Sequence, residues 1–310
     1  MTPKFSIITT CMGRLEHLKE SLPAMLAQPD CEVIVVDYSC PQGTGDYVAE
    51  HFPAARVVRV EGREVFSNWA ARNAGAAQAT GSILVFCDAD TVLRADALTW
   101  IGARLKPGMF AHFERKSTMQ FNTSRLRLGF NQLRGFHALP AQAFRRFGGY
   151  DDVLEGYAAG ADTDLEIRLS IFGFKRLALD PGLVERVVEH GNEDRFRNHK
   201  VGIRCSYAAG YFYRKAKTAL VRMRRRPNLP LPLRRKMYEA AKQAAAALDG
   251  STNSVNFKVD LEHEPIGMPL QLGFKKAKFK MSLHLNIAGE GAMEEIPTHI
   301  GEGATTEPRS

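Results

Sequence analysis

Long apolar runs are missing from this chain of 310 residues. No stretch approaches the ~20 consecutive apolar residues that a membrane-spanning helix needs. The start of the chain, Met1-Thr2-Pro3-Lys4, lacks the apolar segment of a signal peptide. The five cysteines show no metal-binding spacing, and their odd number favours a reducing compartment. We therefore expect a cytoplasmic protein.

Two common phosphate-binding motifs are also missing. No Gly-x-Gly-x-x-Gly follows the first predicted strand, and no Gly-x-x-x-x-Gly-Lys-Ser/Thr occurs anywhere, so neither a dinucleotide fingerprint nor a P-loop is indicated. A phosphate group would have to be held in another way, which favours a metal ion. The composition, with 45% hydrophobic and 25% charged residues, is typical of a globular enzyme with a sizeable core.

The first hundred residues alternate between apolar runs and helical stripes. The runs predict strands at 4–11, 32–37, 56–60 and from Ser82 onwards, and the stripes predict helices at 15–28, 44–52 and 66–79. Such alternation predicts an α/β fold with parallel pairing. Further on, the sequence predicts helices at 95–105, 141–147 and 164–172, and strands at 109–115, 136–139, 177–179 and 184–188.

One apolar run ends in two acids. Ser82 to Cys87 reads as a buried strand, and Asp88 and Asp90 follow it directly. Two carboxylates side by side at a strand end are costly without a cation, and the carboxyl ends of such strands are where open α/β sheets bind ligands. The pattern therefore favours a divalent metal with oxygen ligands and a phosphate-bearing substrate. Loop or helix-capping acids are the alternative interpretation.

A second acidic segment precedes the helix predicted at 164–172. Asp162 and Asp164 stand at its start, where acids suit the helix dipole, so capping alone could explain one of them. The functional interpretation places one carboxylate in an open pocket as a base. His190 follows the apolar run 184–188, as a ligand at a strand end would.

Four segments carry a combined pattern. They are FSIITTCMGR at 5–14, EVIVVDYSC at 32–40, NWAARNAGAAQATGSILVFCDAD at 68–90, and GGYDDVLEGYAAGADTDLEIRL at 148–169. Together they resemble a family 2 glycosyltransferase of the GT-A fold over residues 4–200, with an acceptor-side motif similar to galactosyltransferase and chondroitin-polymerase types. The implied fold is α/β, a GT-A-like, Rossmann-related mixed sheet flanked by helices, with a helical and small β C-terminal extension.

The resemblance implies roles for individual residues. On the donor side it implies that Thr9, Thr10 and Arg14 line the nucleotide pocket and that Asp37 binds the base edge. Arg72 and Asn73 would face the diphosphate and sugar, and Asp88 would bind the donor through the metal ion. Asp88 and Asp90 match the DxD motif that positions Mn²⁺ or Mg²⁺, with His190 as a third ligand. On the acceptor side, Asp162 matches the general base, and Asp164 and Tyr157 match acceptor contacts. Ala161 and Tyr157 depart from the usual Glu and Trp, which puts acceptor contacts in doubt.

The implied activity is an inverting, metal-dependent hexosyl transfer. The donor is a nucleotide sugar, first of all a UDP-sugar, and the acceptor is a hydroxyl of a saccharide or glycolipid in surface polysaccharide synthesis. Two alternatives are a nucleotidyltransferase on a similar sheet and a non-catalytic nucleotide-sugar or polysaccharide binding protein. A nucleotidyltransferase would be expected to have a Gly- and Arg-rich loop after the first strand. Gly13-Arg14 alone is too short to be such a loop.

The C-terminal third changes character. The net charge is +8, and the basic residues concentrate at 214–236, within and after a helix predicted at 201–226. Its aromatic and basic residues fit peripheral contact with the inner membrane face or a lipid-linked acceptor, and equally a packed helix with its basic side in water. No nucleic-acid motif accompanies the charge. We expect a catalytic domain at 1–200 with halves 1–105 and 106–200, a helical extension at 201–250, and a β appendage with a disordered tail at 251–310, including strands at 256–261 and 278–287.

Overall fold

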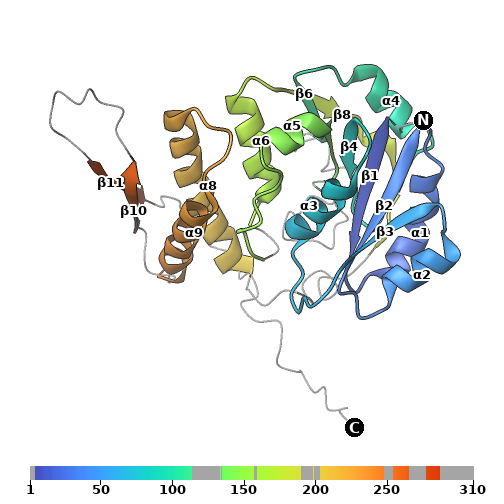
Figure 1. Ribbon diagram of the computed structural model, residues 1–310, viewed down its shortest axis with the longest axis horizontal. Coiled ribbons are helices and arrows are strands. Elements are labelled where there is room, and N and C mark those ends of the chain that lie inside the picture. The colour runs from blue at the N-terminus through green and yellow to red at the C-terminus, as the bar shows by residue number, and fades with distance from the viewer. Residues whose placement is uncertain are drawn as a thin grey trace, which may run out of the picture. The chain divides into compact units, whose positions relative to one another are not determined.

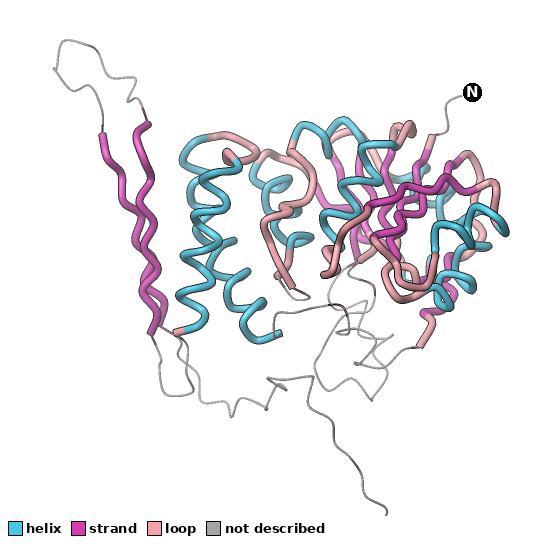
Figure 2. Tube along the Cα trace, turned by 60° about the horizontal axis from the view of Figure 1, so that its bottom comes forward, coloured by secondary structure: helices cyan, strands magenta, loops and turns pink. Residues whose placement is uncertain are grey.

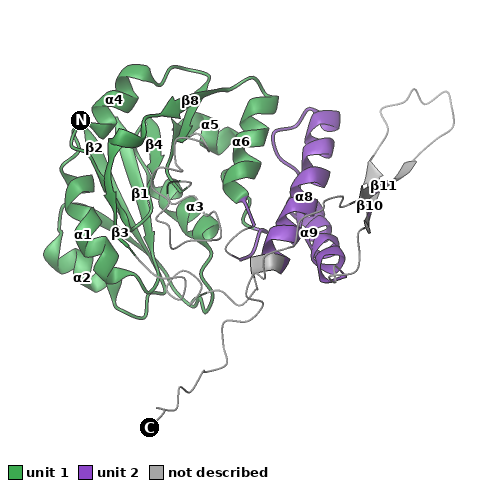
Figure 3. Cartoon of the chain, turned by 180° about the vertical axis from the view of Figure 1, so that it is seen from behind, with its two compact units in different colours: residues 1–152, 161–200 green, residues 153–160, 201–310 purple. Residues whose placement is uncertain are grey.

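The computed structural model describes residues 4–113, 133, 135–156, 159–189, 198, 203–247, 254–264 and 277–286. The chain divides into two compact units (Figure 3), the first of residues 1–152 and 161–200, the second of residues 153–160 and 201–310. Most of the predicted tail, from residue 287 onwards, lies outside the described residues. The finer division predicted at residues 105 and 250 stays a prediction.

A seven-stranded mixed sheet forms the centre of the first unit (Figure 1), in the order β3-β2-β1-β4-β7-β6-β8. Its strands are β1 (Phe5–Cys11), β2 (Cys31–Tyr38), β3 (Ala55–Val60), β4 (Ile83–Phe86), β6 (Met109–Phe113), β7 (His137–Pro140) and β8 (Lys175–Leu179). β7 pairs antiparallel with both β4 and β6, whereas the other pairs in the sheet are parallel. The predicted α/β class and mixed sheet are confirmed.

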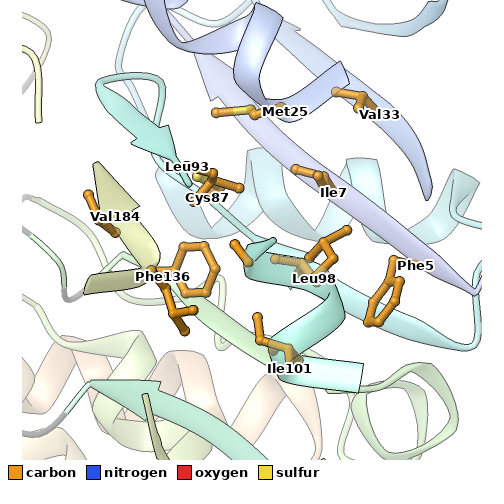
Figure 4. Close-up of a cluster of buried hydrophobic side chains, with 14 of the residues drawn as sticks. Phe5, Ile7, Met25, Val33, Cys87, Leu93, Leu98, Ile101, Phe136 and Val184 are labelled. Carbon is orange, nitrogen blue, oxygen red and sulfur yellow. The ribbon is translucent and has the colours of Figure 1, made fainter. Parts of the chain in front are cut away.

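Helices cover both faces of this sheet. They are α1 (Leu15–Leu26), α2 (Thr44–His51), α3 (Asn68–Gln78), α4 (Ala97–Arg104), α5 (Ala141–Arg146) and α6 (Ala161–Ile171). Strand side chains alternate between faces, and both faces are apolar here. Ile7 and Val33 belong to a buried cluster with Met25 of α1 and Leu98 of α4 (Figure 4). Burial on both faces explains the continuous apolar runs in the sequence.

A short strand follows the paired acids and is absent from the sequence prediction. β5 (Thr91–Leu93) pairs antiparallel with β9 (Val184–Val187), outside the main sheet. Val188 N donates to Asp90 O at 2.7 Å, which extends this contact to the acid itself. Three residues are too few to show a periodic pattern. The sequence therefore predicts only the partner strand β9, as the strand at 184–188. The β5–β9 pair fixes the chain immediately after Asp90.

The start of α6 differs from the prediction. The helix begins at Ala161, three residues before the predicted start at Asp164. Gly160 has a φ of +76°, a backbone conformation that breaks the chain direction just before the helix. Asp162 and Asp164 therefore lie inside the first turn, where the exposed N–H groups favour negative charge.

The second unit contains two helices and a hairpin. Its elements are α8 (Ile203–Arg224), α9 (Leu231–Ala246), β10 (Ser254–Glu264) and β11 (Ala277–Asn286), and β10 pairs antiparallel with β11 (Figure 2). The predicted helices and strands of this region are thus present. Tyr238 of α9 accepts from Glu155 N at 3.0 Å and donates to Glu155 O at 3.2 Å, which ties segment 153–160 to this unit. No helix within the described ranges has the length and apolarity required to span a bilayer.

Candidate donor and acceptor site

Two acid–arginine pairs meet at the carboxyl end of β4. Asp88 follows β4, and its Oδ1 accepts from Arg72 Nη2 of α3 at 2.6 Å. Asp90 Oδ2 accepts from Arg14 Nη1, just before α1, at 3.2 Å. The predicted residues Arg14, Arg72, Asp88 and Asp90 are therefore brought together by β1, β4 and α3. A ligand at this edge would meet charges of both signs.

Arg72 is fully buried, with an exposed fraction of 0%. Its guanidinium lies 5.7–6.0 Å from the ring centroids of Trp69, Phe86 and Tyr150. Nε and Nη1 have no hydrogen-bond partner among the residues that the structure describes. Burial is the largest single influence and disfavours the charge, but Asp88, Tyr150 and Asp162 together outweigh it and raise the pKa of Arg72. The N–H groups on these two nitrogens of a buried cation could donate to an anionic ligand.

Asp88 is crowded as well as charged. Loss of water around its carboxyl raises its pKa, and nearby Asp90 adds to the rise, while Arg72 opposes it. Gly135 approaches so closely that an added Cβ atom would lie 1.7 Å from Asp88 Oδ2. Only a residue without a side chain fits there, and the position had no role in the sequence prediction.

The threonines at the end of β1 differ in their contacts. Thr9 is buried, and its hydroxyl has no hydrogen-bond partner within the described part of the chain. Thr10 Oγ1 donates to Asn68 Oδ1 at 2.9 Å. Thr9 thus keeps an unused polar group near the predicted pocket, whereas the Thr10 hydroxyl contacts the start of α3.

Two predicted donor residues bind the protein's own backbone. Asp37 accepts from Cys40 N at 2.8 Å and from Gly45 N at 2.7 Å, which holds the turn between β2 and α2. The Asn73 side chain pairs with both backbone groups of Tyr150, at 2.9 and 3.0 Å. These contacts explain why the residue types suit the fold, and direct donor contacts of Asp37 and Asn73 stay predictions.

The acceptor-side acids lie on α6. Asp162 is 7% exposed and lines a small pocket with His137, Glu166 and apolar residues of β6, β7 and α6. Asp164 is 3% exposed, and its Oδ2 accepts from Arg168 Nε at 2.8 Å. Arg168 also donates to the carbonyls of Phe147 and Gly149. Asp164 therefore braces α6 internally, and its acceptor contact stays a prediction.

Tyr157 and His190 lie outside the described residues. The structure accordingly gives no contact for the predicted acceptor tyrosine or for the predicted third metal ligand.

A cluster that the sequence prediction missed lies beneath the pocket. His112 of β6, His137 of β7 and Glu166 of α6 are all buried, and one ligand atom from each lies within 4.8 Å of the others. The available signal was a histidine inside each of two predicted strands, where apolar residues are usual. Their meeting depends on strand register, which the sequence does not specify.

The paired aspartates fit a divalent cation. Two carboxylates two residues apart supply the oxygen ligands that Mn²⁺ and Mg²⁺ accept. The raised pKa of Asp88 shows that the carboxylate carries unfavourable negative charge despite Arg72. A cation would relieve it, so the donor set suits the metal that the motif implies.

The comparison with family models settles the assignment. The model described as glycosyl transferase family 2 matches residues 6–113, which include β1 to β6 and the paired acids. The chain carries a glycosyl transferase family 2 domain. The protein is therefore a glycosyltransferase, and its mixed sheet is that of the GT-A fold. The search among curated proteins returned no match.

Two solved structures have a similar fold. A complex of the mannosyltransferase PcManGT from Pyrobaculum calidifontis with GDP-Man and Mn²⁺ is 20% identical, with a TM-score of 0.50, covering 80% of this chain and 77% of that one. S. aureus TarS 1-349 in complex with UDP-GlcNAc is 15% identical, with a TM-score of 0.51, covering 78% of this chain and 72% of that one. At these identities the likeness concerns the fold.

Proposed function

We propose that this glycosyltransferase moves a sugar from a nucleotide-sugar donor to an acceptor hydroxyl. The observation that carries the proposal is Arg72, a buried guanidinium beside Asp88 whose Nε and Nη1 atoms have no hydrogen-bond partner among the described residues. Arginine forks recognise phosphate oxygens strongly. A diphosphate at the carboxyl end of β4 would use these N–H groups, and the unpartnered Thr9 hydroxyl would be a further contact.

Two solved structures of similar fold, both complexes with nucleotide sugars, support a nucleotide-sugar donor. One contains GDP-Man with Mn²⁺ and the other UDP-GlcNAc, so the shared fold accommodates either base. We propose a UDP-sugar and hexosyl transfer for this chain because the segment from β1 to β4 resembles that group of enzymes. Asp37, at the end of β2, is the proposed partner of the base edge.

Asp88 and Asp90, with His190, would hold a Mn²⁺ or Mg²⁺ ion. When bound, a divalent cation offsets the negative charge that develops on the leaving diphosphate. Arg72 and Arg14 contribute fixed positive charge at the same edge without needing to rearrange, through their ion pairs with Asp88 and Asp90.

On the acceptor side, Asp162 is the proposed general base. As the acceptor oxygen attacks the anomeric carbon, the proton of its hydroxyl moves to the Asp162 carboxylate. The new C–O bond forms while the bond to the phosphate oxygen breaks, and the nucleoside diphosphate leaves. A single displacement of this kind inverts the anomeric configuration. Asp164 and Tyr157 are the proposed acceptor contacts.

The acceptor we propose is a saccharide or glycolipid of a bacterial surface polysaccharide. Residues 214–236 carry the basic character that would suit an anionic membrane surface or a lipid-linked acceptor, consistent with a cytoplasmic enzyme peripheral to the membrane.

A donor screen tests the proposal. The purified chain is incubated with Mn²⁺ and separately with UDP-, GDP- and other nucleotide sugars, and the released nucleoside diphosphate is measured with and without simple saccharides. We expect release from one donor class, its loss in chelator and its recovery on adding Mn²⁺ back. Binding without release from any donor would favour the non-catalytic alternative, and transfer of a nucleotidyl group would favour a nucleotidyltransferase.

A further inference from the structure

Two buried histidines lie directly opposite each other on neighbouring strands. His112 of β6 and His137 of β7 are register partners, so their side chains lie on the same face of the sheet. Their ring centroids are 4.2 Å apart. Glu166 of α6 reaches both rings, with Oε1 2.9 Å from His112 Nδ1 and 3.4 Å from His137 Nε2. Three separate elements thus converge on one carboxylate oxygen.

The spacing is that of ligands around one metal ion. Two bonds of ~2.1 Å at angles between tetrahedral and octahedral values place the ligand atoms roughly 3.0–3.4 Å apart. The observed N···O separations are 2.9 Å, just below this range, and 3.4 Å, at its upper end, and all three ligand atoms lie within 4.8 Å of one another. A cation between the rings and Glu166 would need little movement of the backbone.

Two of the three groups, His137 and Glu166, have pKa shifts that suit a metal ligand. Burial and the neighbouring His112 ring lower the pKa of His137 to about 4, although Glu166 opposes this. Burial alone would raise the pKa of Glu166, but contacts with both histidines outweigh it and hold that pKa below its usual range. A neutral imidazole and an ionised carboxylate are the forms that bind metals.

Outer contacts orient two of these groups. His137 Nδ1 is hydrogen-bonded to Tyr150 Oη at 2.9 Å, and Glu166 Oε2 accepts from Arg176 Nη2 at 3.0 Å. Metal-binding histidines usually use their second nitrogen in this way, and such partners fix the ring orientation. The same contacts would also complete an internal hydrogen-bond network, which the experiment below distinguishes from a metal site.

We propose that His112, His137 and Glu166 form a second divalent-metal site, distinct from Asp88 and Asp90. Two imidazoles and one carboxylate favour a transition metal such as Zn²⁺ over Mg²⁺ or Mn²⁺. The site joins β6, β7 and α6, and Glu166 lies one helical turn after Asp162. Bound Zn²⁺ would therefore fix the helix turn that presents the proposed base, a positioning role that does not depend on the donor.

The test uses the full chain with Zn²⁺ alone. The Asp88→Asn/Asp90→Asn variant removes the other metal site, is stripped with chelator, and is titrated with Zn²⁺ by calorimetry and with Co²⁺ by visible absorption. We expect one equivalent per chain and Co²⁺ bands typical of nitrogen and oxygen ligands. Absence of a stoichiometric site in this protein overturns the proposal and leaves a hydrogen-bond network.

Matched substitutions locate the ion. In the same background, His112→Asn and His137→Gln each keep an amide N–H near the ring nitrogen that faces Glu166, so a hydrogen-bond network would survive. We expect Zn²⁺ affinity to fall by more than the roughly 10–100-fold that loss of an outer partner costs. We also expect melting temperatures in chelator to match the parent variant. Unchanged Zn²⁺ affinity in both variants would place the ion elsewhere and overturn the assignment.

Discussion

Asn73 holds the backbone of Tyr150 through both ends of its side-chain amide. Nδ2 donates to Tyr150 O at 2.9 Å, and Oδ1 accepts from Tyr150 N at 3.0 Å, across 77 positions of sequence. The same tyrosine ring lies beside the Arg72 guanidinium. Asn73 therefore acts on the candidate donor site through the position of Tyr150, which the resemblance by itself does not reveal.

Asn73→Asp should weaken both the fold and donor binding. The substitution replaces the N–H donor with an oxygen that faces Tyr150 O, so a part-buried acceptor loses its partner at a cost of about 1–3 kcal/mol. Urea unfolding measures the stability, and calorimetry measures nucleotide-sugar binding. Gln78→Glu makes the same chemical change at an exposed position of α3. Equal effects of the two substitutions would show that the Tyr150 contact is unimportant.

Arg72→Lys should reduce donor affinity about 10–100-fold, the loss expected when an arginine fork becomes a single ammonium at a phosphate. The positive charge beside Asp88 is kept, so the change isolates the planar donor group. Titration with the donor identified in the screen provides the dissociation constant. Arg56→Lys on β3, where the arginine is exposed, is the matched control. Unchanged affinity in Arg72→Lys would remove the guanidinium from the donor site.

Asp162→Asn should slow sugar transfer by ~10²–10⁴-fold, the usual contribution of a general base. Donor affinity should stay within error, because Asp162 is proposed to contact the acceptor. Steady-state transfer rates and donor titrations separate the two. Asp46→Asn makes the same chemical change at an exposed position of α2 and should leave transfer unchanged. A fully active Asp162→Asn enzyme would exclude the residue as the base.

Gly135→Ala should impair the Asp88 site specifically. The added methyl would lie 1.7 Å from Asp88 Oδ2, so the carboxylate must move away from its present position. We expect the Mn²⁺ concentration for half-maximal activity to rise at least ~10-fold, the effect of losing about 1.4 kcal/mol of binding. Gly108→Ala has no atom within 4 Å of its new methyl and reports backbone strain alone. A normal Mn²⁺ requirement in Gly135→Ala would show that Asp88 need not hold the ion.

Cys40 should react with iodoacetamide at unusually low pH. Hydrogen bonds from Cys11 and Thr44 lower the pKa of Cys40 to about 5, although burial opposes this, whereas burial raises the pKa of Cys31 to about 11. Because the thiolate is the reactive form, labelling of Cys40 should be near maximal at pH 6 and fall about tenfold per unit below pH 5. Peptide mass spectrometry follows each cysteine. Preferential labelling of Cys31 at pH 6 would contradict the assignment.

The regular part of the fold follows from periodicity. Apart from the short β5, the strands and helices from β1 to α4 bury their apolar residues in repeating patterns, so their positions are predicted within a few residues. The direction of a strand cannot be predicted in this way. β7 runs antiparallel to β4 and β6 because of the path of the chain between these strands, which no local sequence pattern encodes.

Contacts between side chains from different elements are harder to predict from the sequence. The structure brings Asp88, Asp90, Arg14 and Arg72 together because each stands near the end of an element that reaches the same sheet edge, whereas their roles stay predictions. The pairing of His112 with His137 depends on the register of two strands separated by 23 residues, and a slip of one residue would turn one ring to the other face.

The place of β7 in the sheet has a consequence during synthesis on the ribosome. β1, β2, β3 and β4 are complete once residue 86 has been made, and they pair only with one another until then. β6 ends at residue 113 but takes both of its neighbours from later chain, β7 at 137–140 and β8 at 175–179. Since chains fold progressively as they emerge, the donor half can assemble early. One edge of β6 must wait for β7, and the other waits for more than sixty further residues until β8 is made.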